Sequence, residues 1–276
     1  MHGSLLRILG VDFTSSPSRR KSITVAHATL EGFELEVEAV RHSQDFVAFE
    51  ALLNSPGPWV GAFDFPFGLP RELVETLRWP TDWPELVTTV GAMERSAFRS
   101  ALTSVRESRP MGARYIARRG DAMAGSSSPM KLVNPPVGLM FLEGAPRLLK
   151  AGVSVLPCAP RTDPRIALEA YPGYLARKIT RASYKKDGKE GMSPDRFQAR
   201  TTLVDALVST SAAVSGIAVK LSQNLKANCV ADGSGDTLDA VMCAIQAAQS
   251  VVAGSLFAIP SAADPLEGWI VTVPDS

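Results

Sequence analysis

The chain has 276 residues, 45% of them hydrophobic and 21% charged, which is enough length and apolar content for a substantial core. Its formal net charge of +1 excludes a strong overall attraction to nucleic acid or membranes, so any basic surface has to be local. No apolar stretch approaches the roughly 20 residues that span a bilayer, and the first residues lack the layout of a signal peptide. We therefore expect a cytoplasmic protein with no membrane partner.

The first quarter of the chain predicts four strands and one short helix. Alternating or continuous apolar runs predict strands over residues 5–12, 22–30, 33–40 and 59–64. The second and third of these flank the turn Glu31-Gly32 and predict a hairpin with one solvent-exposed face. Ser43 is a candidate N-cap for a helix that ends near Leu53. The expected order is therefore strand, strand, strand, helix, strand.

The first and fourth of these strands each end in one carboxylate, Asp12 and Asp64. A charged group at the end of a buried strand costs several kcal/mol unless something compensates it. In an enzyme a metal ion or a reacting group commonly provides that compensation, and sites often lie where strands open into loops. The alternative for Asp64 is that it caps the following turn by accepting backbone N–H bonds.

The rest of the chain predicts a mostly helical insertion over about residues 70–150 that covers the sheet, followed by further strands and helices. Strands are expected at 153–156 and 166–171, and helices at 92–105, 193–207, 212–225 and 236–252. The strand at 166–171 carries Glu169 just before a Pro-Gly break. Asp236 and Asp239 are three residues apart, so on a helix they share a face. The alternatives are a capping role for these two aspartates and an ion pair with a nearby arginine for Glu169.

Five acids thus lie at the boundaries of apolar elements: Asp12, Asp64, Glu169, Asp236 and Asp239. Carboxylates cannot gather unpaired in a buried place, because like charges raise one another's pKa values and repel. Divalent cations remove this difficulty, since Mg²⁺ prefers oxygen ligands and combines a few carboxylates with water and substrate phosphate. Two such ions roughly 4 Å apart can activate a water and stabilise the leaving oxygen in phosphodiester hydrolysis.

The order of the first five elements resembles the start of a ribonuclease-H-like fold, and the helix at 236–252 is similar to the final acidic helix of Holliday-junction resolvases of that superfamily. The full set of motifs is Gly10-Val11-Asp12, Asp64-Phe-Pro-Phe-Gly-Leu-Pro70, Asn134-Pro135-Pro136-Val137-Gly138, Glu169-Ala-Tyr-Pro172 and Asp236-Thr-Leu-Asp239-Ala240. Together they resemble domain-of-unknown-function family 429, a set of predicted ribonuclease-H-like nucleases. The resemblance extends over nearly the whole chain and implies a single α/β domain, residues 1–276.

The resemblance also implies a nuclease that uses Mg²⁺ or Mn²⁺ and binds nucleic acid. Asp12 would bridge two ions, Asp64 and Glu169 would complete their coordination, and Asp239 or Asp236 would add a ligand from the helix. Glu169 departs from ordinary ribonuclease H, in which the second acid lies on the first helix. Candidates for phosphate contacts are Arg114, Arg118, Arg119, Lys131 and Lys178, for each of which a solvated surface charge is the alternative.

Two other functions are compatible with the same pattern. Sugar kinases and actin-like ATPases share this type of sheet, which would make the protein a phosphoryl-transfer enzyme, but the chain has no second copy of the sheet and no glycine-rich phosphate loop. A non-catalytic binding module with a degenerate metal site is the alternative from another class. The three histidines and three cysteines lie in no metal-ligand spacing, so zinc chemistry is not expected.

Overall fold

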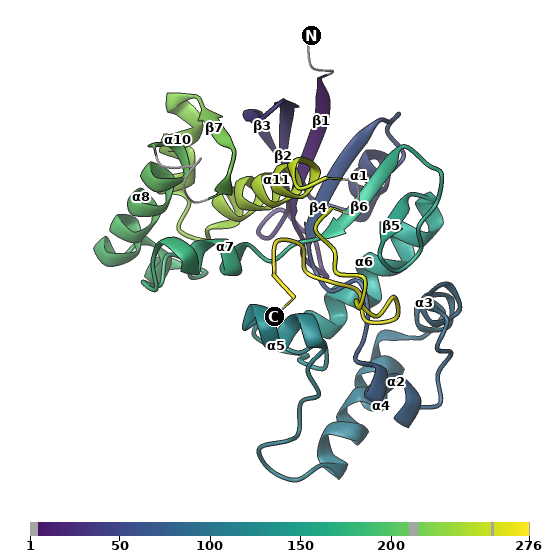
Figure 1. Ribbon diagram of the computed structural model, residues 1–276. Coiled ribbons are helices and arrows are strands. Elements are labelled where there is room, and N and C mark those ends of the chain that lie inside the picture. The colour runs from purple at the N-terminus through teal and green to yellow at the C-terminus, as the bar shows by residue number, and fades with distance from the viewer. Residues whose placement is uncertain (1–4, 210–214, 255–256, 276) are drawn as a thin grey trace.

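The computed structural model describes residues 5–209, 215–254 and 257–275. Over these residues the fold is a mixed α/β architecture, in which helices flank a seven-stranded, mostly parallel sheet (Figure 1). Its strands are β1 (Leu6–Asp12), β2 (Ile23–Glu31), β3 (Glu34–Ser43), β4 (Trp59–Asp64), β5 (Ser154–Leu156), β6 (Arg165–Glu169) and β7 (Ala218–Leu221). The strand order is β5-β6-β4-β1-β2-β3-β7, and only the pairs β1–β2 and β2–β3 are antiparallel.

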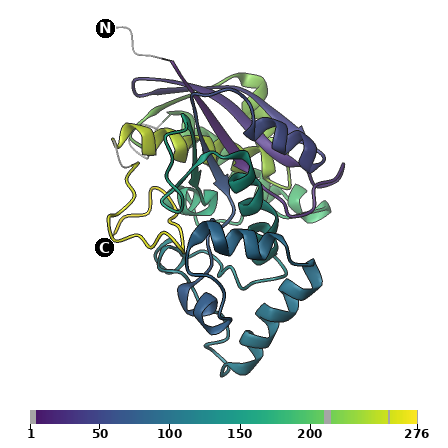
Figure 2. The ribbon, with the colours of Figure 1, turned by 90° about the vertical axis from the view of Figure 1, so that its right-hand side faces the viewer.

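The helices are α1 (Phe46–Leu53), α2 (Arg71–Thr76), α3 (Trp83–Gly91), α4 (Arg95–Ser108), α5 (Arg119–Ala124), α6 (Val137–Ala151), α7 (Pro172–Ile179), α8 (Pro194–Ser209), α10 (Gln223–Ala231) and α11 (Asp236–Val252), with a 3-10 turn at Lys189–Met192. Helices α2 to α6 form the insertion. Both ribbon views show α2 to α5 at one end of the sheet, beyond the ends of β1 and β4 (Figures 1 and 2). Within the described residues, no helix has the length and apolar character needed to cross a membrane.

The prediction of the first five elements is confirmed, with one change at the start of α1. Asp45, and not Ser43, is the N-cap, because its carboxylate accepts the backbone N–H of Ala48 at 2.9 Å. Strands β1 and β4 are parallel neighbours, and their register places Asp12 directly beside Asp64. The two strand-end carboxylates therefore meet at the same edge of the sheet.

Two predicted helices differ from the structure. The helix expected at 92–105 begins three residues later, because a turn after α3 separates it from α4. Of the helix expected at 212–225, residues 212–214 lie outside the described part of the chain, and much of the rest is strand β7. Val219 and Leu221 are buried while their neighbours are exposed, which is the alternation of a strand that pairs with β3.

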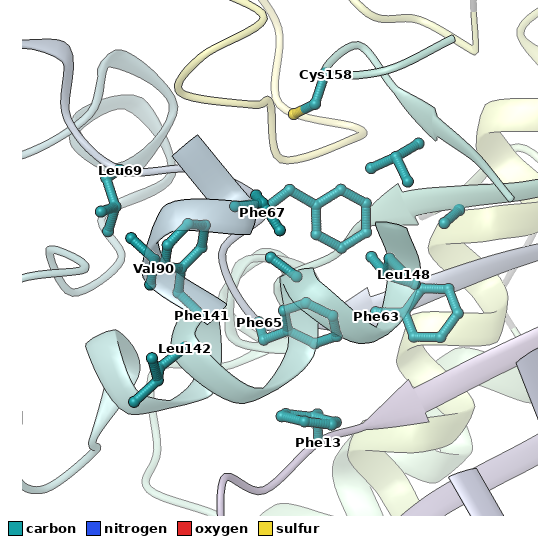
Figure 3. Close-up of a cluster of buried hydrophobic side chains, with 14 of the residues drawn as sticks. Phe13, Phe63, Phe65, Phe67, Leu69, Val90, Phe141, Leu142, Leu148 and Cys158 are labelled. Atoms are coloured by element: carbon teal, nitrogen blue, oxygen red, sulfur yellow. The ribbon is translucent and has the colours of Figure 1, made fainter. Parts of the chain in front are cut away.

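Each face of the sheet packs against its own hydrophobic core. One face is covered by α1 and the insertion, and its core includes Phe63 and Phe67. Figure 3 shows these rings with Phe13 and Phe65, beside Phe141 and Leu148 of α6. The opposite face is covered by α7, α8, α10 and above all α11, which is buried along most of its length. The candidate site lies on this second face.

Helix α11 can approach β1 closely because residue 10 is a glycine. A Cβ atom built at Gly10 would lie 2.1 Å from the carbonyl oxygen of Ala240 and 2.2 Å from the backbone nitrogen of Ala244. Any other residue would push the helix away from the strand. The glycine of the Gly10-Val11-Asp12 motif thus permits the close contact between β1 and α11, which brings Asp239 next to Asp12.

Candidate metal centre

Three carboxylates converge on the face of the sheet that α11 covers. Asp12 is the last residue of β1, Asp64 is the last residue of β4, and Asp239 lies in the first turn of α11. One oxygen from each lies within 4.8 Å of the others. Asp12 is 8% exposed and Asp239 is fully buried. These three acids, which are far apart in the sequence, therefore meet in the structure as the sequence predicts.

Aromatic residues next to these aspartates help to fix where the carboxylates point. Successive residues of a strand face opposite sides of the sheet, so Phe13 and Phe65 extend the face opposite to Asp12 and Asp64. The two rings pack with their centroids 4.6 Å apart in the core under the insertion (Figure 3). Both phenylalanines are almost completely buried. Their packing anchors the chain just after each strand and directs both aspartates towards α11.

The three aspartates differ in the hydrogen-bond and ion-pair partners of their carboxylate oxygens. Within the described part of the chain, no hydrogen bond or ion pair reaches the carboxylates of Asp12 and Asp64. Asp239 is fully engaged: the hydroxyl of Tyr184 donates to its Oδ1 at 2.6 Å, and the ammonium of Lys185 forms an ion pair with its Oδ2. The Lys185 side chain is 42% exposed, so this cation reaches the group from the solvent side.

Burial and mutual repulsion oppose full ionisation of this group. Burial raises the pKa of Asp12 well above its usual range, and the charges of Asp236 and Asp239 add to the effect. Burial raises the pKa of Asp64 to about 7, although Lys185 works against that change. Burial also raises the pKa of Asp239, again against the influence of Lys185. Two carboxylates that no described residue contacts through a hydrogen bond or ion pair, and whose pKa values are raised, favour the binding of protons or of a cation.

Asp236 lies beside the three-aspartate group but outside it. Its carboxylate pairs with the ammonium of Lys21 at 2.9 Å, and its side chain is 14% exposed. Asp236 is not the cap of α11: the N-cap residue is Gly235, with φ of 79°, and the carboxylate of Asp232 accepts the backbone N–H of Thr237 at 2.8 Å. The alternative of a capping box formed by the two helix aspartates is therefore not what the structure shows.

Glu169 does not join the aspartates, and the strand register gives the reason. Glu169 pairs with Phe63, the residue before Asp64, so its side chain faces the insertion instead of α11. There Arg118 donates to both of its oxygens, at 2.5 and 2.8 Å, and the backbone N–H of Phe67 donates to one of them at 2.8 Å. Glu169 is 2% exposed. The interpretation of Glu169 as a metal ligand is corrected to that of a buried ion-pair partner.

The five cations proposed for phosphate contacts do not form one surface. Arg118 is 3% exposed, and its guanidinium is held between two carboxylates. It contacts Asp121 at 2.8 Å and Glu169 at 2.5 Å. Arg119 pairs with Asp275. The ammonium of Lys178 lies 4.6 Å from the ring centroid of Tyr174, Arg114 is exposed and Lys131 is half-buried. Arg118 is therefore corrected from a surface phosphate contact to an internal counter-ion.

A cleft of about 490 Å³ opens beside Asp64, and the sequence does not predict several of its polar residues. Its lining includes Tyr184, Lys185, Arg181 and Arg177 as well as Arg118. Lys185 and Arg181 are exposed residues of a polar loop, and such loops carry no periodic pattern that predicts their contacts. The only signal for this part of the cleft in the sequence is the run of cations that follows Glu169, at Arg177, Lys178, Arg181, Lys185 and Lys186.

The donor set fits a hard divalent cation. All three ligands would be carboxylate oxygens, which Mg²⁺ and Mn²⁺ prefer, and two of them lack any other partner among the described residues. Comparison of the chain with family models, with curated proteins and with solved structures finds no match. The chemical interpretation of the site therefore rests on its own geometry.

Proposed function

We propose that the protein is a metal-dependent nuclease that hydrolyses phosphodiester bonds of DNA or RNA with Mg²⁺ or Mn²⁺. The observation that carries this proposal is the convergence of Asp12, Asp64 and Asp239, with oxygen atoms within 4.8 Å of one another. Such ions commonly bind to a few carboxylates and complete their coordination with water and substrate phosphate. The cleft beside Asp64 leaves space for that substrate.

A ribonuclease-H-like fold is part of the same proposal. The chain forms an antiparallel meander of β1, β2 and β3, then α1, and then β4 parallel to β1. Carboxylates end β1 and β4, and the acidic helix α11 comes last. This is the order of elements on which the sequence resemblance to that superfamily is based. The nuclease activity itself is argued from the site, because one fold hosts many functions.

Each residue of the site has a role in this proposal. Asp12, Asp64 and Asp239 would hold the metal through their carboxylate oxygens. A divalent ion held there would supply an activated water and stabilise the charge on the departing 3′ oxygen. Tyr184 orients Asp239 by donating a hydrogen bond to it, and Lys185 places a positive charge at the cleft, where it would attract an anionic phosphate.

A cleavage screen with Mn²⁺ tests the proposal directly. Wild-type protein and Asp64→Asn are incubated with single-stranded DNA, single-stranded RNA, duplexes and a four-way junction, in Mn²⁺ and in EDTA. We expect cleavage of at least one substrate by the wild type in Mn²⁺ only, and its loss in the variant. Equal cleavage by the two proteins would point to a contaminating nuclease and count against the assignment.

The ion pair between Lys185 and Asp239 favours one alternative, a non-catalytic nucleic-acid-binding module. A protein cation that already neutralises part of an acidic group can stand in for a metal ion permanently. Calorimetric titration separates the two functions: a nuclease binds Mn²⁺ with an affinity that Asp12→Asn reduces. Wild-type protein that binds nucleic acid but no divalent ion would support the binding module.

A further inference from the structure

The cleft beside Asp64 lies between the insertion and the segment that contains α7. One wall is formed by the insertion, including Val137 and Met140 of α6, and the other by α7 and the loop that follows it. Figure 1 shows α7 above α5 in that view, and the guanidinium of Arg177 joins the two walls by donating to the carbonyl oxygen of Ala124 at the end of α5. The cleft is therefore walled on two sides, and Asp64 is the one of the three aspartates that lines it.

The volume of the cleft limits what can enter it. About 490 Å³ is within the range of roughly 300–1,000 Å³ that is usual for sites that bind small molecules. A single nucleotide is a ligand of this size class. A base pair inside a double helix is stacked on both sides and cannot enter such a cavity unless one base leaves the stack.

The lining of the cleft also has two chemical parts. Apolar side chains of Val137, Met140 and Ile270 offer a surface against which a flat base can pack. Lys185 lies next to the aspartates, and Arg181 is an exposed cation for which no ion pair is found within the described ranges. Cations near apolar or aromatic surfaces are the combination by which proteins bind unpaired nucleotides.

The buried charged residues of the cleft are bound to one another. Arg118 also lines the cavity, but its charge is used by Asp121 and Glu169, which it contacts through four hydrogen bonds of 2.5–2.8 Å. Arg181 therefore remains to attract an anionic ligand, whereas Lys185 brings a positive charge to the cleft while it is paired with Asp239.

On the basis of the proposed function, we propose that the cleft binds one unpaired nucleotide. Its phosphate lies towards Asp64 and Lys185, and its base packs against Val137 and Met140. The substrate class is then single-stranded nucleic acid, a strand end or a free nucleotide, and not an intact duplex. A strand and a free nucleotide offer the same chemistry to the cleft, so the test includes both.

Binding is measured by fluorescence anisotropy with labelled oligothymidylate, alone or paired with oligoadenylate, and with thymidine 5′-monophosphate as competitor. Each titration is done in EDTA and in Ca²⁺. The test variant is Val137→Trp, which fills the cleft from a half-buried position at the start of α6. Its matched control is Val133→Trp, because Val133 is 58% exposed and lies outside the cleft lining. Mn²⁺ titration of all proteins reports on the metal centre separately.

We expect wild-type protein to bind the single strand at least about ten-fold more tightly than the duplex, because only an unpaired base is free to stack in the cleft. Val137→Trp should weaken single-strand binding by about ten-fold or more and leave the Mn²⁺ isotherm unchanged, whereas Val133→Trp should alter neither. If Val137→Trp fails to fold, Arg181→Glu, at an exposed position, should weaken single-strand binding about five-fold. Competition by thymidine 5′-monophosphate would identify the free nucleotide as sufficient.

Two results would overturn this inference: equal affinity for duplex and single strand, or single-strand binding that Val137→Trp and Arg181→Glu leave unchanged. If Mn²⁺ still binds in that case, the metal centre stands and the substrate class is wrong. If single-strand binding depends on Val137 and Arg181 but no Mn²⁺ binds and no cleavage occurs, the nucleotide cleft stands and the proposed catalysis fails.

Discussion

Replacement of Asp64 by asparagine should stabilise the protein without metal while removing its response to metal. Asparagine has nearly the same size and shape as aspartate but cannot ionise. In the folded protein the pKa of Asp64 is raised from 3.8 to about 7, first by burial and then by the charge of Asp239. The folded state therefore binds this proton more tightly than the unfolded state does, and stability falls as pH rises from about 4 to about 7.

The size of this effect follows from the pKa difference. Each pKa unit corresponds to about 1.4 kcal/mol, so the ionisation of Asp64 lowers the free energy of unfolding by up to about 4 kcal/mol at pH 8. The Asp64→Asn variant cannot ionise at this position, so its free energy of unfolding is not lowered in this way. We expect the variant to match the wild type near pH 4 and to be more stable by about 2–4 kcal/mol at pH 8 in EDTA.

Urea denaturation at these two pH values, in EDTA and in Mn²⁺, measures both parts of the prediction. A ligand at 100 times its dissociation constant adds about 2.7 kcal/mol to the free energy of unfolding. The wild type should gain stability of this order in Mn²⁺, and Asp64→Asn should gain much less. The control is Asp205→Asn, at an exposed position of α8, which should respond to pH and to Mn²⁺ like the wild type. A variant that is less stable than the wild type at pH 8 in EDTA, or equally stabilised by Mn²⁺, would refute the reasoning.

Three further substitutions test separate parts of the account. Gly10→Ala should lower the free energy of unfolding by at least about 1–3 kcal/mol in urea, because its Cβ would overlap the backbone at Ala240; an unchanged midpoint would show that α11 does not pack as described. Lys185→Met should tighten Mn²⁺ binding about ten-fold in calorimetry, because it removes the cation that holds Asp239; weaker binding would show that Lys185 supports the metal site instead of competing for it. Arg118→Met should cost about 3–5 kcal/mol of stability, because two buried carboxylates lose their counter-ion, and a cost below about 1 kcal/mol would contradict their assignment as a structural cluster.

The convergence of Asp12 and Asp64 could be predicted from the sequence because each follows an apolar run that reaches a clear end. Parallel strands bring such ends to the same edge of a sheet, so the position of each acid along its strand was sufficient. The position of Asp239 could be predicted for a similar reason, since it lies in the first turn of a helix whose apolar surface requires burial against the sheet.

The face of the sheet on which Glu169 lies could not be predicted from the sequence. Ala167 and Leu168 lie on opposite faces of β6 and are both buried, so the apolar pattern does not say which core the acid faces, and a register difference of one residue places it on the opposite side from Asp64. Tyr184 and Lys185 lie in a polar loop without periodicity, and their contacts with Asp239 arise from tertiary structure alone. The alternation at Val219 and Leu221 is too short to distinguish a strand from part of a helix.

The most direct test of the metal centre is the anomalous diffraction of a crystal of the wild-type protein soaked in MnCl₂. We predict at least one manganese peak coordinated by oxygen atoms of Asp12, Asp64 and Asp239 at about 2.0–2.3 Å, with Lys185 moved away from Asp239. A well-ordered crystal with manganese bound only elsewhere, and with the ion pair between Lys185 and Asp239 intact, would contradict the account.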